Sequence, residues 1–273
     1  MQESRNLNNC WRSDLTRTLR GFATLLSVLC PCWAALALAD TPAGSEEAQF
    51  VFGTPDEPSE AWLLAAGGRI YDNWWDALDR KEPTDAHPAY PESGRKTGST
   101  TWRCKECHGW DYRGRDGRYG EGSHYTGIKG IDRAKGSDPA RIAKLLREKP
   151  HSYSAEMIKD DELARVAAFV SAGQDETARF VDPKTGAVKG DKKRGEAIFQ
   201  TTCAACHGFK GRLLNWGTSE KPAYVGTEAN AAPDEVLHKI RNAHPGAAMV
   251  NLRVFPIEDA AAVLAYVKTL PQK

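Results

Sequence analysis

Apolar residues at helical spacing dominate the pattern of this chain, and strand-like alternation is weak throughout. Residues 138–150 and 232–245 are similar segments with apolar positions three and four apart, and each begins with an Asp-containing capping signal. The amphipathic segments 161–173 and 257–271 follow them, with ends marked by Gly and Pro. This pattern predicts an all-α protein.

The helical pattern occurs twice in the same order, which indicates an internal repeat. We expect one domain over residues 60–174 and a second over residues 190–273. Between them, residues 175–189 are polar with Gly and Pro breaks, as in a linker. Each half has the size of one small domain.

The first 39 residues have the features of a secretory signal peptide. Four arginines precede an apolar run over residues 21–39, which ends in the small-residue pattern Ala37-Leu38-Ala39. An uncleaved membrane anchor is the alternative, but the run is barely long enough to span a bilayer and contains Pro31. We expect cleavage before Asp40, an acidic leader over residues 40–59, and a periplasmic protein with no membrane span.

The net charge bears on the choice of partners. Removal of the signal peptide takes four basic and two acidic residues from totals of 37 and 36, which leaves a net charge near −1. Such a balance gives no reason to expect nucleic acid or anionic lipid as the main partner.

Cysteines give the sharpest chemical signal. Three of the seven fall within the expected signal peptide, and the other four form two C-x-x-C-H motifs, "CKECH" at 104–108 and "CAACH" at 203–207. Two thiols three positions apart lie on one side of a helical turn, where both can form thioethers to one haem. The next residue, His108 or His207, then projects toward the iron. The sequence therefore predicts two covalently attached c-type haems, bound through Cys104, Cys107, Cys203 and Cys206.

Two other uses of paired cysteines are less consistent with this chain. A redox-active C-x-x-C pair does not require the following His and belongs near a βαβ pattern, which the sequence lacks. Two pairs can hold one zinc ion, but zinc ribbons separate them by about 15–20 residues, whereas 95 residues lie between Cys107 and Cys203.

The order of helix, C-x-x-C-H, loop, helix, methionine and closing helix resembles that of class I cytochrome c, in each half. The resemblance implies two tandem cytochrome c-like helical domains whose first and last helices cross. It places Gly195 and Phe199 against Tyr266 in the second half. In the first half it places Gly67 or Gly68, together with Tyr71, against Phe169.

The first half departs from this resemblance. Residues 81–102 form an insertion, rich in Pro and Gly, between its first helix and its haem motif. No role follows from the sequence, and a surface loop that covers one haem edge is the expected form.

The resemblance also implies a thioether ligand opposite each motif histidine. Met157 and Met249 are the only methionines after the signal peptide, 49 and 42 residues beyond His108 and His207. We expect both to bind iron, although Met is also a common core gap-filler. His151, His244 and His124 are rival ligands, while His87 and His238 fall outside the expected ligand loops and are expected to be structural or exposed.

Met/His ligation favours electron transfer, because it leaves no open site on the iron. We therefore expect a relay that takes electrons from a dehydrogenase or quinol-oxidising complex and passes them to an oxidase or reductase. The alternative is a haem enzyme with one open site, of the peroxidase or sulfur-compound dehydrogenase type. The known thiosulfate dehydrogenases use an additional cysteine ligand, which the mature chain lacks.

Overall fold

A computed structural model describes residues 43–273, with side chains described from residue 48 onward. The predicted signal peptide and its cleavage site lie outside the described residues. The described residues belong to one compact unit. This part of the chain is helical and has no extended strand, only two isolated bridges, Gly114 with Lys129 and Val181 with Val188. The all-α prediction is confirmed for the described residues.

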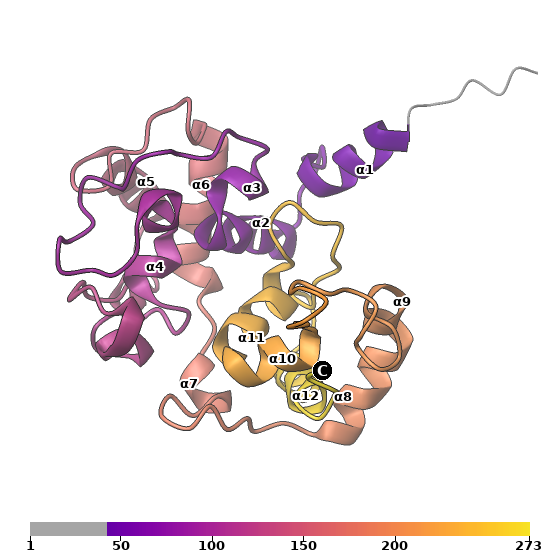
Figure 1. Ribbon diagram of the computed structural model, residues 1–273. Helices are drawn as coiled ribbons and strands as arrows, with labels where there is room; N and C mark the ends of the chain where they lie inside the picture. Colours follow the sequence, from indigo (N-terminus) through magenta and orange to yellow (C-terminus); the bar gives the residue numbers. More distant parts are fainter. Residues whose placement is uncertain (1–42) are drawn as a thin grey trace, which may run out of the picture. The chain divides into compact units, whose positions relative to one another are not determined.

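Figure 1 shows the helices of each half. Those of the first half are α1 (Ala43–Phe52), α2 (Glu60–Asp72), α3 (Trp74–Ala77), α4 (Cys104–His108), α5 (Pro139–Arg147) and α6 (Asp160–Ala168). Those of the second are α7 (Thr177–Phe180), α8 (Lys192–Ile198), α9 (Ala204–His207), α10 (Val225–Ala231), α11 (Pro233–Asn242) and α12 (Ile257–Val267). Within the described residues, no helix has the length and apolar character that crossing a membrane requires.

Local chemistry sets several of these helix ends. The Ser59 side chain accepts a hydrogen bond from the backbone N–H of Trp62 at the start of α2. The Asp138 and Asp191 carboxylates accept backbone N–H bonds at the starts of α5 and α8. These contacts satisfy donors that the first turn of a helix leaves free.

In the first half, α2 crosses α6 at Gly67. A Cβ atom at this position would overlap the backbone carbonyl of Arg165, so only glycine permits the close approach. The Tyr71 and Phe169 rings pack beside the crossing, with centroids 5.5 Å apart. The predicted contact is confirmed, with Gly67 as the glycine at the crossing.

The second half repeats this crossing with α8 and α12. A Cβ atom on Gly195 would overlap the carbonyl of Ala262, and the Phe199 and Tyr266 rings lie 5.6 Å apart. This expected contact is also confirmed. Each half has its own hydrophobic core, one around Trp74 and Phe169 and the other around Phe199 and Leu264.

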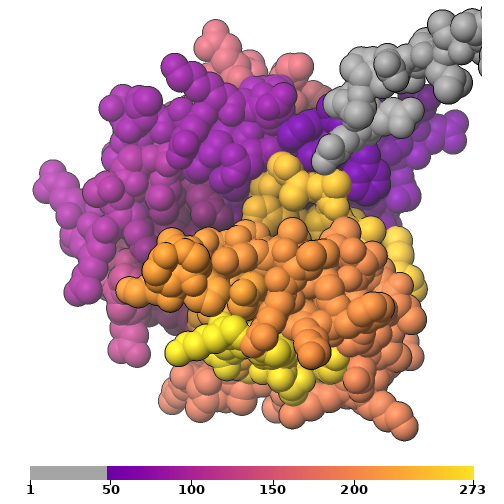
Figure 2. All heavy atoms as spheres, turned by 45° about the vertical axis from the view of Figure 1, so that its right-hand side comes forward, coloured from indigo at the N-terminus to yellow at the C-terminus, as the bar shows by residue number. Residues whose placement is uncertain are grey.

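The two halves contact each other through α2 and α11. Gly68 faces the second half, where a Cβ atom would overlap the Asn242 side chain, and its carbonyl accepts a hydrogen bond from His238 Nε2 at 2.9 Å. The Tyr112 hydroxyl donates to His238 Nδ1 at 3.0 Å, so both nitrogens of this buried ring have partners. In Figure 2 the second half, drawn in orange and yellow, lies directly against the indigo and purple first half.

The segment expected to link the halves packs against the second one. Phe180 and Val181 belong to the second hydrophobic core. The Asp175 carboxylate forms ion pairs of 3.3 Å with both Arg241 and Arg253. Buried apolar and charged contacts therefore hold residues 175–189 in place.

Candidate haem-binding sites

The first C-x-x-C-H motif forms helix α4, which ends at His108 and is capped by Gly109 with a φ of +79°. Glycine adopts this left-handed conformation without strain. The Tyr71 hydroxyl donates to the Gly109 carbonyl at 2.6 Å, and Cys104 packs against the core of the first half. The helix crossing therefore fixes the position of the motif.

His108 has the hydrogen-bonding arrangement of a metal ligand. Its Nδ1–H donates to the backbone carbonyl of Lys129 at 2.9 Å, which leaves the Nε2 lone pair available. Desolvation lowers the pKa of His108 to about 4. The ring is therefore neutral near pH 7, as ligation requires.

The second motif begins at Cys203, the last residue of the helical segment Phe199–Cys203, and continues through α9. Gly208, with a φ of +76°, caps α9. The His207 ring lies 6.3 Å from the Phe199 ring and 5.9 Å from the Trp216 ring. Its Nδ1 is buried without a hydrogen-bond partner among residues 48–273.

The thiols lack the properties of a redox-active pair. Burial raises the pKa of Cys104 to about 11 and that of Cys107 to about 12, whereas reactive C-x-x-C thiols have lowered pKa values. Burial also raises the pKa of Cys203 to about 11. All four thiols are free of disulfides, and no cluster of three or more metal-binding side chains occurs in the described part of the chain. The motifs therefore do not converge on a shared zinc ion.

The surroundings of both motifs suit a haem. In the second half several large apolar side chains near the motif are exposed: Phe209, Leu213, Leu214 and Trp216. A porphyrin would bury such surface. The first motif lies among aromatic residues, with Tyr153 Oη 4.0 Å from Cys104 Sγ. Free thiols and a neutral imidazole beside apolar side chains are the groups to which a c-type haem binds.

The predicted thioether ligands lie in different settings. Met157 is partly buried and packs against the core of the first half. Met249 is partly exposed, in the loop between α11 and α12, and its backbone N–H donates to the Ala247 carbonyl at 2.8 Å. Ligation by either residue stays a prediction.

Two rival histidines have other partners. His124 stacks on Tyr119 with ring centroids 4.6 Å apart, and its Nδ1 lies 2.7 Å from Glu106 Oε1. Although burial alone would raise it, the contacts with His124 and Lys105 lower the pKa of Glu106 to about 2. His244 is partly buried, and its Nδ1–H donates to the Pro245 carbonyl at 2.8 Å.

The third rival, His151, lies close to the first motif, with its ring centroid 6.2 Å from that of His108. The insertion 81–102 packs on the loop that carries it. His87 Nε2–H donates to the His151 carbonyl at 3.0 Å, and the Tyr153 hydroxyl donates to the Trp102 carbonyl at 2.8 Å. The sequence showed no role for this insertion, although its His and Trp side chains were signals of a packed segment.

Basic residues around the first motif are mostly paired with acids. The pairs are Arg103 with Asp72, Lys105 with Glu106, Arg115 with Asp116, and Arg118 with Asp234. This surface is therefore one of mixed charge rather than a free basic patch.

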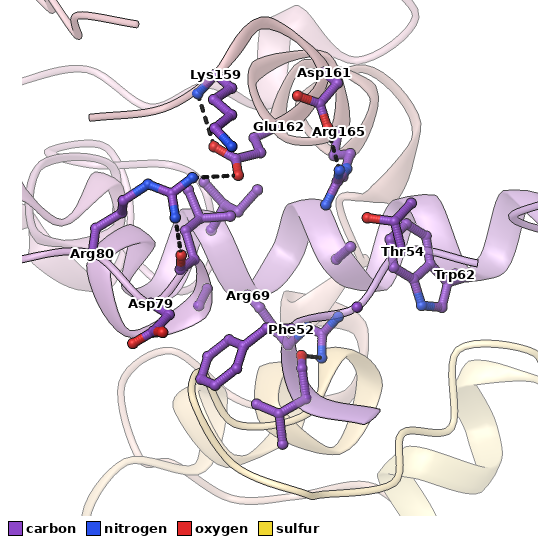
Figure 3. A pocket seen from close by; sticks show the side chains of 16 residues that line it. Phe52, Thr54, Trp62, Arg69, Asp79, Arg80, Lys159, Asp161, Glu162 and Arg165 are labelled. Carbon is purple, nitrogen blue, oxygen red and sulfur yellow. Dashed lines mark hydrogen bonds and ion pairs between the residues drawn. The ribbon is translucent and has the colours of Figure 1, made fainter. Parts of the chain in front are cut away.

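A hollow of about 370 Å³ lies apart from both motifs, bordered by residues of α1, α2 and α6 (Figure 3). Its charged side chains largely pair with one another: Arg80 with Glu162 at 2.8 Å, and Arg165 with Asp161. Arg69 reaches the Val51 carbonyl at 3.5 Å. None of the predicted haem residues lines this hollow.

Comparison with known families bears on the second half. Residues 190–267 match the family model described as "Cytochrome C oxidase, cbb3-type, subunit III". The match includes Cys203, Cys206 and His207, and it supports a cytochrome c family and a covalently bound c-type haem. A cytochrome c domain of this kind indicates an electron-transfer haem protein. No curated protein matches the chain.

Proposed function

We propose that the protein is a periplasmic di-haem c-type cytochrome that relays electrons between partner proteins. One observation carries this proposal. The Cys203-Cys206-His207 constellation lies inside the region that matches a cytochrome c family, and Cys104, Cys107 and His108 repeat it at the equivalent place in the first half.

The residues of each motif have separate tasks. The two thiols would anchor the haem, and His108 or His207 would bind its iron. Hydrogen bonding to the Lys129 carbonyl keeps the His108 ring in one orientation and tautomer. When bound, a haem supplies reversible one-electron exchange between ferric and ferrous iron. At the second motif, Met249 would be the other residue that binds the haem iron.

The contact between the halves supports a relay. The Gly109 carbonyl, directly after the first motif, accepts a hydrogen bond from the Tyr71 hydroxyl. The Tyr71 ring also packs against His238 on α11 of the second half, with ring centroids 5.8 Å apart. The buried hydrogen bonds that His238 forms with Gly68 and Tyr112 join the two halves and limit their relative motion. Such rigidity maintains a constant separation between two redox sites.

The partners we propose are a donor dehydrogenase or quinol-oxidising complex and an acceptor oxidase or reductase. A near-neutral mature chain and paired surface charges give no support to a nucleic-acid partner. Export through the signal peptide places the protein where such periplasmic partners meet it.

A mass spectrum of the denatured protein tests the proposal, after expression with a signal peptide in a host that attaches c-type haem. The mass should equal the chain from Asp40 plus two haems. Joint replacement of Cys104 and Cys107 by Ser should remove one haem, and the same change at Cys203 and Cys206 should remove the other. A chain that carries no covalent haem would contradict the proposal.

Ligand binding separates the relay from the enzyme alternative. A relay with two occupied axial positions should bind cyanide slowly and show no high-spin ferric haem. A wild-type haem that is high-spin and binds cyanide at once would favour a peroxidase- or dehydrogenase-type activity instead.

A further inference from the structure

The imidazole rings of His108 and His151 have centroids 6.2 Å apart and planes inclined at 38°. A metal–imidazole bond is about 2.0 Å long and the bonded nitrogen lies roughly 1.1 Å from the ring centre, so two imidazoles on opposite sides of one ion have centroids about 6 Å apart. Two imidazoles joined by a direct hydrogen bond would be about 1 Å closer. The spacing matches a pair of rings that share one metal ion.

Both rings are anchored in the same way. His108 Nδ1–H donates to the Lys129 carbonyl at 2.9 Å, and His151 Nδ1–H donates to the Leu145 carbonyl at 3.1 Å. A carbonyl partner at Nδ1 fixes the tautomer that keeps the lone pair on Nε2. Metal-binding histidines regularly have this arrangement.

The backbone around His151 is held from two sides. The Tyr153 N–H donates to the Leu146 carbonyl at 3.1 Å, which ties the loop to α5. From the insertion, His87 donates to the His151 carbonyl, and its ring packs 4.3 Å from that of Trp102. These contacts fix the position of the ring, as a ligand requires.

The second half lacks this support. Its first helix continues from Lys192–Ile198 through Phe199–Cys203 directly into the haem motif, with no insertion between them. The sequence feature that distinguishes the two halves therefore packs against the loop that carries His151.

We propose that His151, rather than Met157, binds the iron opposite His108, so that the first haem has two histidine ligands. This inference rests on the proposed function, because it requires a haem at Cys104 and Cys107. Two imidazoles give a lower reduction potential than an imidazole and a thioether. With Met249 on the second haem, the potential difference favours electron transfer from the first half to the second.

Two matched variants of the full haem-loaded protein test the assignment: His151→Ala and Met157→Leu. Each variant is first assayed for two covalent haems per chain, then mixed as ferrous protein with carbon monoxide. His151→Ala should bind carbon monoxide rapidly at half of its haem, while Met157→Leu and wild type should not. In the ferric protein, Met157→Leu should leave the intensity of the sulfur-to-iron charge-transfer band unchanged.

His151→Met provides a second test. It should keep the first haem low-spin, add a second sulfur-to-iron band and raise the potential of that haem. If His151→Ala does not fold, the sulfur-to-iron band of the wild-type ferric protein still tests the proposal. A band with the intensity of two methionine-ligated haems overturns it. A band with the intensity of at most one such haem supports it.

Three other results would overturn the proposal: loss of sulfur-band intensity in Met157→Leu, rapid carbon monoxide binding by that variant, or a folded His151→Ala protein that behaves as wild type. Absence of covalent haem from the first motif is a different failure, because it contradicts the proposed function itself. The haem assay therefore separates the two.

Discussion

The Lys239 ammonium on α11 lies 2.6 Å from Oδ2 of Asp72, the last residue of α2, and so forms a buried ion pair between the two halves. Arg103, next to the first haem motif, pairs with the same carboxylate. Although burial alone would raise it, Lys239 and Arg103 hold the pKa of Asp72 well below its usual range. One buried anion thus connects the second half to the residue that precedes Cys104.

Removal of one cation should weaken this contact. Lys239→Ala leaves the buried carboxylate with Arg103 alone, and we expect a loss of about 2–4 kcal/mol in the free energy of unfolding. Lys192→Ala, at an exposed position on α8, is the control and should change it by less than about 0.5 kcal/mol. Urea unfolding measures both. Equal small effects would show that the ion pair adds nothing to stability.

The buried His238 should make stability depend on pH. Burial lowers its pKa from 6.5 to about 4, so protons bind more tightly to the unfolded chain. The contribution of His238 to the free energy of unfolding is therefore complete above pH 6.5. On the order of 3 kcal/mol of it is lost as the pH falls toward 4. His238→Gln does not titrate there, so its urea midpoint should decline less over this range. Parallel declines in the two proteins would contradict this role.

Gly195→Ala should disrupt the second half. The added Cβ would overlap the Ala262 carbonyl, a backbone atom that cannot rotate away. Overpacking of this kind costs about 1–3 kcal/mol or more. Glu196→Ala, at the next and exposed position, should be nearly neutral. Thermal unfolding monitored at a haem absorption band tests the pair, and similar melting temperatures would argue against close packing of α8 on α12.

His87 is expected to act as a positioning residue for His151. His87→Ala removes the donor to the His151 carbonyl, so carbon monoxide should bind the first haem faster than in wild type. His87→Gln retains an N–H donor and should restore slow binding. Tyr90→Phe is the control: Tyr90 lies in the same insertion, where its hydroxyl accepts a hydrogen bond from the Lys96 N–H. This variant should not change the rate of carbon monoxide binding. Fast binding in Tyr90→Phe would indicate a general loosening of the insertion.

Met249→Ala should act on the second haem alone. Loss of the thioether should abolish the sulfur-to-iron band and lower the potential of that haem, while haem attachment is unchanged. Val250→Ala, at the adjacent exposed position, is the control. A band that survives in Met249→Ala would assign the thioether to another residue.

The sequence alone determined the features that depend on near neighbours along the chain. The two cysteines of each C-x-x-C-H motif lie within one helical turn, so the spacing of their thiols follows from local geometry. Apolar periodicity predicted the helices, and a glycine four residues before an aromatic, at Gly67 and Gly195, marked the repeat. These features need no knowledge of the tertiary fold. The helix crossings were implied only by the family resemblance, and the structure decided for Gly67 over Gly68.

Only the tertiary structure decided which distant residues meet. His87 reaches the backbone of His151 across 64 positions, and Lys239 reaches Asp72 across 167. No periodicity or propensity encodes such pairs, because they depend on how the helices pack and how the chain returns between them. For the same reason, the sequence could name His151 as a rival ligand, but only the folded chain placed its ring 6.2 Å from that of His108.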